Sequence, residues 1–491
     1  MLKVGFYTLG CKVSLYETEA ISEGFARAGY EIAPFSEVCD VYVINTCTVT
    51  AESDAKSRKY IRRAIRKNPE AVVIVIGCYS QRSPDEVAAI DGVSAVLGTA
   101  DKMKCVEIAS RLVNEKSAKR KVQSAKLAFS MGEGGPFAKQ MENEVASPFR
   151  RGGGEADGEI ASPSRRGGSE GDGEVLKTEI FVTPLDGAKF EPMCVENAPR
   201  TRAYVKIEDG CECKCTYCAI SGARGPVRSK RPEDVISEVE GLYKSGTLEI
   251  VLTGIETGSY GADFAEKYDL ADLMRELDRR HSCERIRLGS MAPELLSERF
   301  IEKIKDLKIM VPHFHISMQS GADNVLRGMK RRYNRTMILK NIAAIREAMP
   351  DVMLTADLMV GFPGESDEDF CDTLRFVREA RLLDAHVFAY SKREGTPAAS
   401  FDCQIPEQIK KIRSQTLISE CAAVRDEILS EVVGRGKPLS CILESYNKGI
   451  YTAHSDSYIE VRVEGERGLS GNLVSVQPLR HESGVIYGKI L

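Results

Sequence analysis

The amino-acid sequence predicts an α/β protein with three folded parts: an N-terminal parallel α/β domain, a central partial (β/α) barrel and a small C-terminal β-barrel. Strand-like and helix-like segments alternate over residues 1–113 and again over 197–428, which is typical of parallel strands covered by helices. Residues 429–491 instead contain short strand-like runs separated by Gly, Asn and Ser, a pattern that favours a small β-barrel. A chain of 491 residues also exceeds one ordinary hydrophobic core, so several domains are expected.

In the N-terminal part, we expect three strands: LKVGFYTLG at the start of the chain, VYVINT (41–46) and AVVIVIG (71–77). The last of these runs is continuously apolar and is bounded by Gly, which indicates a strand buried on both faces. Helical segments are expected near residues 17–28 and 53–67. This alternation predicts a small parallel sheet with helices on its faces.

Residues 114–196 differ in composition from the rest of the chain. ASPFRRGGGEADGEI (146–160) recurs as ASPSRRGGSEGDGEV (161–175), so the segment contains a direct repeat with a 15-residue period. Gly, Ser, Glu, Asp and Arg dominate it, and such residues bury too little apolar surface to offset the entropy lost on ordering. We predict a low-complexity, disordered insertion here. The alternative is a tail that contacts RNA through its two Arg-Arg pairs, which the neighbouring acidic residues disfavour.

The central part, residues 197–428, repeats strand-like and helix-like runs at intervals of roughly 30–40 residues, as a (β/α) barrel does. The strand-like runs include RAYVKIED, LEIVLTG, RIRLGSM, HFHISMQ and VMLTADLMVGFP. In a barrel of this kind the active site lies at the C-terminal ends of the strands. Residues that directly follow the strand-like runs are therefore the first candidates for function.

The overall composition excludes several classes of protein. Hydrophobic residues make up 43% of the chain and charged residues 29%, as in globular proteins, and no apolar run approaches the ~20 residues that span a bilayer. The opening segment lacks the apolar stretch and cleavage site of a secretion signal, so we expect a cytoplasmic location and no membrane partner. The formal net charge of −4 does not itself indicate nucleic-acid binding. Fifteen cysteines in such a chain point to metal sites, redox chemistry or buried thiols.

The most informative motif is Cys211-Glu-Cys-Lys-Cys215-Thr-Tyr-Cys218, which directly follows the strand-like run RAYVKIEDG. Three thiolates within eight residues can hold one [4Fe–4S] cluster and leave its fourth iron without a protein ligand. An open iron of this kind can bind the amino and carboxylate groups of S-adenosylmethionine and pass an electron to its sulfonium. The alternative is a zinc site, which needs four ligands, and no fourth Cys or His lies nearby except Cys213 inside the motif, which we take as a bystander.

A second set of three cysteines lies in the N-terminal part. Cys11 in TLGCKVS, Cys47 in INTCTVT and Cys78 in IGCYSQ each directly follow an expected strand. Because the carboxyl ends of parallel strands meet at one edge of a sheet, these thiols should converge in space. The alternative is that all three are ordinary buried thiols, which is our interpretation of Cys39, Cys105, Cys194, Cys283, Cys371, Cys403, Cys421 and Cys441.

Two three-cysteine sets, one on an α/β domain and one on a barrel, resemble the methylthiotransferases of the radical SAM superfamily. The C-x3-C-x2-C spacing with an aromatic residue before the last Cys is the superfamily's signature. The C-terminal part is similar to the TRAM domain of that family, a small RNA-binding β-barrel. The resemblance covers the chain except for residues 114–196. Its supporting stretches are GPVRSKRPEDV (225–235), LTGIETGSYG (252–261), HISMQSGADNVLRGMKRRYNR (315–335), DLMVGFPGES (357–366) and HVFAYSKREGTPA (386–398).

The resemblance implies a mechanism with two [4Fe–4S] clusters. The cluster that cleaves S-adenosylmethionine to a 5′-deoxyadenosyl radical would be held by Cys211, Cys215 and Cys218. The cluster that supplies or carries the sulfur, which a second S-adenosylmethionine methylates, would be held by Cys11, Cys47 and Cys78. The radical removes hydrogen from an unreactive C–H bond, and a methylthio group replaces it. An external electron donor of the flavodoxin or ferredoxin type is implied, and no acid–base catalyst is identified.

Members of this family act on three main substrates. TLGCKVS, NTCTVTAESDAKSRKYIRRA and YSKREGTPA most resemble the branch that modifies C2 of N6-threonylcarbamoyladenosine at position 37 of tRNA, next to the anticodon. Ser14 stands where this family usually has Asn. The alternatives are isopentenyladenosine in tRNA and an aspartate of a ribosomal protein. A more distant alternative is a non-catalytic iron–sulfur protein that binds RNA, which would need neither the open iron nor the barrel motifs.

The resemblance also implies where S-adenosylmethionine binds, because the superfamily holds it at the ends of barrel strands. The six candidate residues are Gly254, Glu256, Gln319, Ser320, Met359 and Gly361.

Binding of tRNA is expected at two basic stretches, although charge runs are more often solvated faces. In the first stretch, spacings of three and four place several cations on one face of the expected helix, as phosphate contacts would require. That stretch contains Lys56, Arg58, Lys59, Arg62, Arg63, Arg66 and Lys67, and the second contains Arg327, Lys330, Arg331, Arg332 and Arg335.

Overall fold

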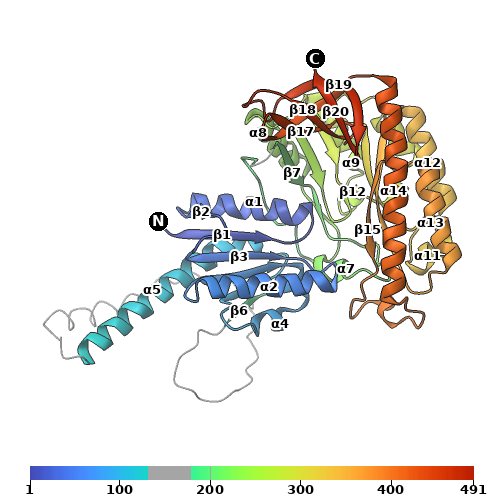
Figure 1. The fold of residues 1–491 in the computed structure, drawn as a ribbon. Helices are drawn as coiled ribbons and strands as arrows, with labels where there is room; N and C mark the ends of the chain where they lie inside the picture. The colour runs from blue at the N-terminus through green and yellow to red at the C-terminus, as the bar shows by residue number, and fades with distance from the viewer. Residues whose placement is uncertain (131–177, 199–200) are drawn as a thin grey trace.

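The computed structural model describes residues 1–130, 178–198 and 201–491. It contains an N-terminal parallel sheet domain, a partial barrel of parallel strands and a closed five-stranded C-terminal barrel (Figure 1). The predicted α/β architecture with these three parts is confirmed. No helix in the described part of the chain is long and apolar enough to cross a membrane.

The N-terminal domain is one six-stranded parallel sheet covered on both faces. Its strand order is β2-β1-β3-β4-β5-β6. One face packs against α1 (Lys12–Arg27) and α5 (Cys105–Ser130), and the other against α2 (Ala51–Lys67), α3 (Cys78–Arg82) and α4 (Pro84–Ala88). β3 and β4 are buried at every position because both of their faces are covered. The strands are β1 (Lys3–Thr8), β2 (Glu31–Ala33), β3 (Val41–Thr46), β4 (Val72–Gly77), β5 (Ala95–Leu97) and β6 (Glu179–Phe181).

The structure differs from the predicted 114–196 insertion at both of its ends. α5 continues as far as Ser130, and β6 pairs in parallel with β5 as the last strand of the N-terminal sheet. Phe181 of β6 packs on the core beneath α1 and α5. A three-residue strand is too short to show an alternating pattern, so sequence periodicity does not reveal it. The 15-residue repeat lies outside the described residues.

The central part is an open barrel of parallel strands. β7, β10 and β11 form one sheet in the order β11-β10-β7, and β12 to β15 form a second in sequence order. Only Gly289 separates β11 from β12, and Ile286 of β11 bridges Met310 just before β13, so the two sheets follow one another around the barrel. The strands are β7 (Arg202–Lys206), β10 (Glu249–Thr253), β11 (Arg285–Leu288), β12 (Ser290–Met291), β13 (His313–Gln319), β14 (Met353–Val360) and β15 (Asp384–Ala389).

Helices between these strands cover the outside of the barrel and bury their apolar faces on it. α9 and α13 each begin with a capping box, in which the first polar side chain and the one three residues later satisfy each other's backbone amides. These caps fix the residue at which each loop after a strand ends and its helix begins. The covering helices are α8 (Pro232–Lys244), α9 (Leu270–Arg280), α10 (Glu298–Ile304), α12 (Arg335–Ala348) and α13 (Asp367–Ala380).

A long helix, α14 (Glu407–Arg435), packs along β15 and leads into the C-terminal barrel (Figure 1). That barrel closes in the order β16-β17-β18-β20-β19. Arg285 of the central barrel donates to the carbonyl of Ser440, so the two barrels are bonded directly. The five strands are β16 (Leu439–Asn447), β17 (Ile450–Ser455), β18 (Glu460–Glu464), β19 (Leu473–Glu482) and β20 (Val485–Ile490).

Candidate functional site

The three N-terminal cysteines lie at one edge of the first sheet. Cys11 precedes α1, Cys47 follows β3, and Cys78 opens α3 directly after β4. A side chain built on Gly10 would lie 3.4 Å from Cβ of Cys47, which shows how closely the Cys11 and Cys47 loops approach. Burial raises the pKa of Cys47 and raises that of Cys78 to about 11, and the neighbouring Cys11 thiol acts in the same direction on both. The structure therefore brings together the three thiols that the sequence placed after separate strands.

The second set lies in the loop between β8 (Glu208–Asp209) and α7 (Ile220–Arg224), directly after the first barrel strand. The amide of Cys218 donates to the carbonyl of Cys215, and Sγ of Cys218 accepts from the amide of Ile220 at 3.4 Å. Burial raises the pKa of Cys215 to about 11 and also raises that of Cys218. The loop thus holds the sulfur atoms in a short, hydrogen-bonded turn.

Neither cysteine set is compact enough for a single metal ion. Among the described residues, the only group whose ligand atoms all lie within 4.8 Å of one another is His315, Asp357 and His386. A zinc ion bound at about 2.3 Å to each sulfur would need a tighter set than either. Each set instead offers three thiols, the number that can hold a four-iron cluster and leave its fourth iron open.

Cys213 is close to Cys211 in the folded chain. A side-chain hydrogen bond between them raises the pKa of Cys211 and lowers that of Cys213 to about 6. Both side chains are partly exposed. The geometry therefore leaves Cys213 within reach of anything that Cys211 binds.

The candidate residues for S-adenosylmethionine lie at the C-terminal ends of β10, β13 and β14, the strand ends that also face the cysteine loop. Gly254 has no room for a side chain, because a Cβ there would lie 2.4 Å from Oε2 of Glu208. The amide of Glu256 donates to that same Oε2, and Oε1 of Glu256 accepts from the amide of Ala292 at 3.0 Å. Burial raises the pKa of Glu256 to about 7. Gly254 and Glu256 thus form a tightly packed strand end beside the cysteines.

The other four candidates have different environments. Gln319 ends β13 with a φ of 69°, a left-handed conformation that turns the chain sharply, and Gly361 after β14 has a φ of 72°. Met359 packs in one cluster with Tyr217 of the cysteine loop. Ser320 is fully buried, and its hydroxyl contacts Thr373 and accepts from the amide of Ala322. The Ser320 hydroxyl is therefore engaged at the start of the following helix, α11 (Asp323–Gly328), rather than open to a ligand.

A cavity of about 540 Å³ lies between the Cys11 loop, the inner face of the central barrel and the C-terminal barrel. Cys11 and Gly254 both line it, so it joins the first cysteine set to the candidate cofactor residues. Its wall is rich in charged and polar side chains. These include Lys12, Arg287, His313, His315, Asp357, His386, Arg425, His454 and Glu460.

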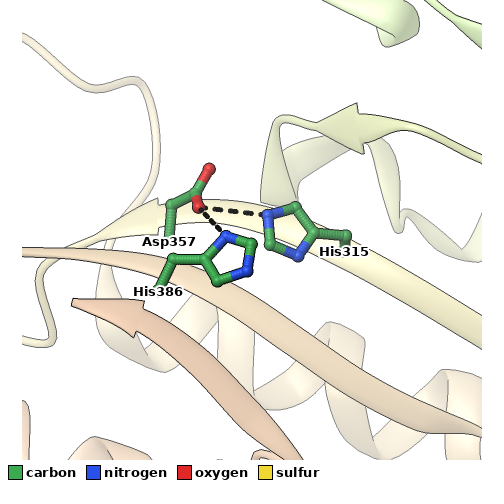
Figure 2. A group of neighbouring side chains, drawn as sticks. All are labelled: His315, Asp357 and His386. Carbon is green, nitrogen blue, oxygen red and sulfur yellow. Dashed lines mark hydrogen bonds and ion pairs between the residues drawn. The ribbon is translucent and has the colours of Figure 1, made fainter. Parts of the chain in front are cut away.

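Figure 2 shows three of these side chains, which come from three neighbouring strands. Oδ1 of Asp357 lies 3.2 Å from Nε2 of His315 and 3.2 Å from Nδ1 of His386. The other ring nitrogen of His315 contacts Oγ1 of Thr355 at 2.8 Å. Burial acts to raise the pKa of Asp357, but the two imidazoles outweigh it and hold that pKa below its ordinary value, while the carboxylate raises the pKa of His386. The group offers a fixed carboxylate and an exposed imidazole to the cavity.

A buried ion network joins the N-terminal domain to the barrel beneath both cysteine sets. Oε1 of Glu17 in α1 accepts from Nζ of Lys102 at 2.9 Å, Nζ of Lys206 at 2.8 Å and Nη1 of Arg224 at 2.5 Å. Nε of Arg224 also donates to Sγ of Cys78 at 3.1 Å. Asp209, two residues before Cys211, accepts from Lys206 and Arg224. The network therefore ties the strand end that carries Cys78 to the strand end that carries Cys211.

The two basic stretches are used differently by the fold. In α2, the side chains of Lys59, Arg62, Arg63 and Arg66 are exposed on one face. In the second stretch, Arg335 is paired with Asp372 and Glu379. Arg331 is largely inside, stacked near Tyr217 and Tyr333 beside the cysteine loop. Arg327, Lys330 and Arg332 of the second stretch are exposed as well, so both stretches can meet another molecule, and the α2 face presents the larger set of exposed cations.

The cavity residues other than Cys11 and Gly254 were not identified from the sequence. A signal was present, because the runs RIRL and HFHIS alternate polar and apolar residues, and buried strands that do so turn their polar side chains to one face. Whether these polar side chains meet in one cavity depends on how the strands close into a barrel. The residue pattern of a single strand carries no information about that closure.

Two family models match the chain. The model described as the radical SAM superfamily matches residues 205–377, which contain Cys211, Cys215 and Cys218. The model described as uncharacterized protein family UPF0004 matches residues 3–98, which contain Cys11, Cys47 and Cys78. Each match thus includes one of the two cysteine sets.

Similar proteins with assigned functions extend over nearly the whole chain. The threonylcarbamoyladenosine tRNA methylthiotransferase MtaB of Bacillus subtilis (strain 168) is 36% identical and covers 98% of this chain and 94% of its own length. The tRNA-2-methylthio-N(6)-dimethylallyladenosine synthase of Desulfitobacterium hafniense (strain Y51) is 29% identical and covers 99% and 97%. Among solved structures, the radical S-adenosylmethionine methyltransferase TsrM of Kitasatospora setae matches with a TM-score of 0.50 at 16% identity, over 81% of this chain and 77% of that one. The last likeness shows a shared fold only.

Proposed function

The chain belongs to the radical SAM methylthiotransferases, and we propose that it adds a methylthio group to C2 of N6-threonylcarbamoyladenosine at position 37 of tRNA. As a member of this family it is a radical SAM enzyme, which uses a [4Fe–4S] cluster and S-adenosylmethionine. The competing substrate within tRNA is dimethylallyladenosine (isopentenyladenosine), because synthases for that modification are also similar over nearly the full length.

The observation that carries the substrate proposal is the character of the cavity at Cys11. Two cations, Lys12 and Arg287, and several histidines line it. A threonylcarbamoyl group carries a carboxylate, a hydroxyl and an amide, whereas a dimethylallyl group is a hydrocarbon. Polar groups buried against a hydrocarbon would lose water without gaining hydrogen bonds, and this mismatch disfavours the hydrocarbon strongly. The relatives named for threonylcarbamoyladenosine, at 31–36% identity for three of them, support the same choice.

We assign the cluster that binds S-adenosylmethionine to Cys211, Cys215 and Cys218, and a second [4Fe–4S] cluster to Cys11, Cys47 and Cys78. Each set supplies three free thiols, the number that holds a cluster and leaves one iron open, and this supports the assignment. When bound, these groups supply the reductive cleavage of S-adenosylmethionine, the removal of hydrogen and the sulfur. An external electron donor of the flavodoxin or ferredoxin type would complete the system.

The chain's own residues then bind, orient and shield. Gly254 lets Glu208 pack directly against the strand end, because any side chain there would collide with Oε2 of Glu208. Glu256 is 8% exposed, with one oxygen on the amide of Ala292, so it offers a fixed acceptor to an amino group at that end. Cys11 is the exposed member of its set and faces the cavity, which suits the cysteine nearest the substrate.

For tRNA we propose the exposed face of α2 as a phosphate-contacting surface. Lys59, Arg62, Arg63 and Arg66 recur at spacings of three and four on one face of the helix. α2 begins four residues after Cys47, and its first amide donates to Ser391 of the barrel, so its N-terminal end lies beside the proposed site. The C-terminal barrel resembles a TRAM domain and would provide a separate contact with the tRNA.

The deciding experiment is a nucleoside analysis of tRNA from a strain that lacks this gene. We expect 2-methylthio-N6-threonylcarbamoyladenosine to disappear and its unmethylthiolated precursor to accumulate, while the methylthiolated isopentenyl nucleoside is unchanged. Loss of the isopentenyl product alone would overturn the substrate proposal and leave the family assignment intact. Loss of neither, with a change in a ribosomal protein mass, would favour the aspartate substrate.

The tRNA surface has its own test. Replacing Lys59 and Arg63 with alanine should reduce the slope of log affinity against log salt by about 0.7–0.9 for each lost phosphate contact. Arg275→Ala, on the outer face of α9, is the matched control and should leave the slope unchanged. An unaltered slope in the double variant would place the phosphate contacts elsewhere.

A further inference from the structure

Two cations that line the cavity at Cys11 have donor groups without a partner among the described residues. Lys102, Lys206 and Arg224 each bond to a carboxylate. In contrast, the side chain of Lys12 is partly buried and makes no hydrogen bond or ion pair with any described residue. A cation withdrawn from water without a partner is costly, so such a group points to a missing anion.

Arg287 shows the same deficiency at a single nitrogen. It is 2% exposed, and its Nε and Nη2 donate to the two oxygens of Glu249 at 2.9 and 3.1 Å. Its remaining nitrogen, Nη1, is buried and has no hydrogen-bond partner among the described residues. Glu249 therefore holds the guanidinium group of Arg287 in one orientation. One of its nitrogen donors, Nη1, stays unused, on a side chain that lines the cavity.

The two groups act on each other. Both side chains carry positive charge and line the same cavity. The carboxylate of Asp357 lines it too, but its Oδ1 is already shared by His315 and His386. An incoming anion would relieve the repulsion between the two cations and satisfy both free donors at once.

We propose that Lys12 and Arg287 bind the carboxylate of the amino-acid substituent on N6 of the target adenosine. This inference rests on the proposed function and names the residues that select its substrate. Lys12 directly follows Cys11, so a substituent anchored at Lys12 keeps the base within reach of the first cysteine set. The pair would distinguish an anionic substituent from a hydrocarbon of similar size, because only the anion can accept from both donors.

The test measures binding of anticodon stem-loop RNAs to the reconstituted enzyme by fluorescence anisotropy. One RNA carries N6-threonylcarbamoyladenosine, and a second carries the same group with its carboxylate replaced by a primary amide. For the unaltered protein we expect the carboxylate RNA to bind about tenfold more tightly or better, as a hydrogen-bonded charge provides. In Lys12→Met this ratio should fall to near one, while binding of the amide RNA stays unchanged.

Lys244→Met is the matched control, because Lys244 is exposed at the end of α8 on the outside of the barrel, and its ratio should equal that of the unaltered protein. Arg287→Lys keeps a charge beside Glu249 but removes the fork, and it should lower the ratio without preventing folding. A ratio unchanged in both Lys12→Met and Arg287→Lys would overturn the inference. If the unaltered protein itself preferred an isopentenyladenosine RNA, the proposed function would fail instead, so the two failures are distinguishable.

Discussion

Replacing Glu17 with Gln should be among the most damaging single-atom changes in this protein. Glu17 is fully buried, and one of its oxygens accepts from three cations, which reach it from three separate segments of the chain. Burial acts to raise the pKa of this carboxyl, but the charges of Arg224, Lys102 and Lys206 outweigh it and hold the pKa well below its ordinary value. The amide of Gln keeps the shape and one acceptor while removing the negative charge.

Removing one partner of a buried ion pair lowers the free energy of unfolding by about 3–5 kcal/mol, because the remaining charge stays buried without a counter-charge. At about 2 °C for each kcal/mol in a domain of a few hundred residues, Glu17→Gln should lower the midpoint of thermal unfolding by at least about 6 °C. The control is Glu196→Gln, which removes the charge from an exposed pair with Arg27 at the end of the same helix. Since exposed pairs contribute about 0–1 kcal/mol, its midpoint should move by about 2 °C or less.

A second substitution separates charge from shape. Lys102→Met in the Glu17→Gln background removes one of the cations left without a partner, so the double variant should be more stable than the sum of the single effects predicts. Calorimetry of the four proteins gives the coupling directly. Equal midpoints for Glu17→Gln and Glu196→Gln, or strictly additive effects in the double variant, would refute the idea that this network holds the N-terminal domain on the barrel.

Three further predictions concern the site itself. Iron content after anaerobic reconstitution should fall by about one cluster in Cys211→Ala and stay unchanged in Cys213→Ala; the reverse result would exchange their roles. In Asp357→Asn, histidine titration by NMR should show a lower pKa for His386, because the carboxylate raises the pKa of that imidazole. The pKa of His386 is higher in the folded state than in the unfolded state. The pair therefore stabilises the fold below about pH 6.5, and this contribution is lost as the pH rises through the folded-state pKa. Gly77→Ala should lower the free energy of unfolding by about 1–3 kcal/mol and reduce the iron content of the N-terminal cysteine set. The reason is that φ of Gly77 is 102° and a Cβ there would lie 2.6 Å from a backbone oxygen of β3. An unchanged midpoint of urea unfolding would contradict this prediction.

The sequence was sufficient for the fold class and for the approach of each cysteine set to one sheet edge. Both follow from local pattern, because alternation of strands and helices implies parallel pairing, and parallel pairing places all strand ends at one edge. The short strand β6 was missed because three residues carry no period, and its partner β5 is far away in sequence. The predicted insertion therefore extends too far at its C-terminal end, where it includes β6.

The cavity could not be predicted in the same way. Lys12, Arg287 and Asp357 come from the N-terminal domain and two different barrel strands, and each is unremarkable beside its sequence neighbours. Their meeting depends on strand tilt and on how the N-terminal domain docks, which are properties of the tertiary fold. Ser320 is a different case, because its strand-end position suggests a ligand and its hydroxyl also accepts a hydrogen bond at the start of α11.

The charges at the domain interface give a physical reason why cluster binding and domain docking should be linked. Among the described side chains that these ion pairs join, four cations meet three carboxylates: Lys102, Lys206, Arg224 and Arg228 against Glu17, Asp209 and Glu191. The Arg224 side chain also points Nε at Sγ of Cys78. A neutral thiol leaves the excess positive charge in place, whereas a thiolate bound to iron supplies the missing anion. Since Arg224 belongs to the barrel and Cys78 to the N-terminal domain, binding of the proposed second cluster would strengthen the contact between the two domains. By linkage, a weaker contact between the domains would lower the affinity for the cluster by the same free energy.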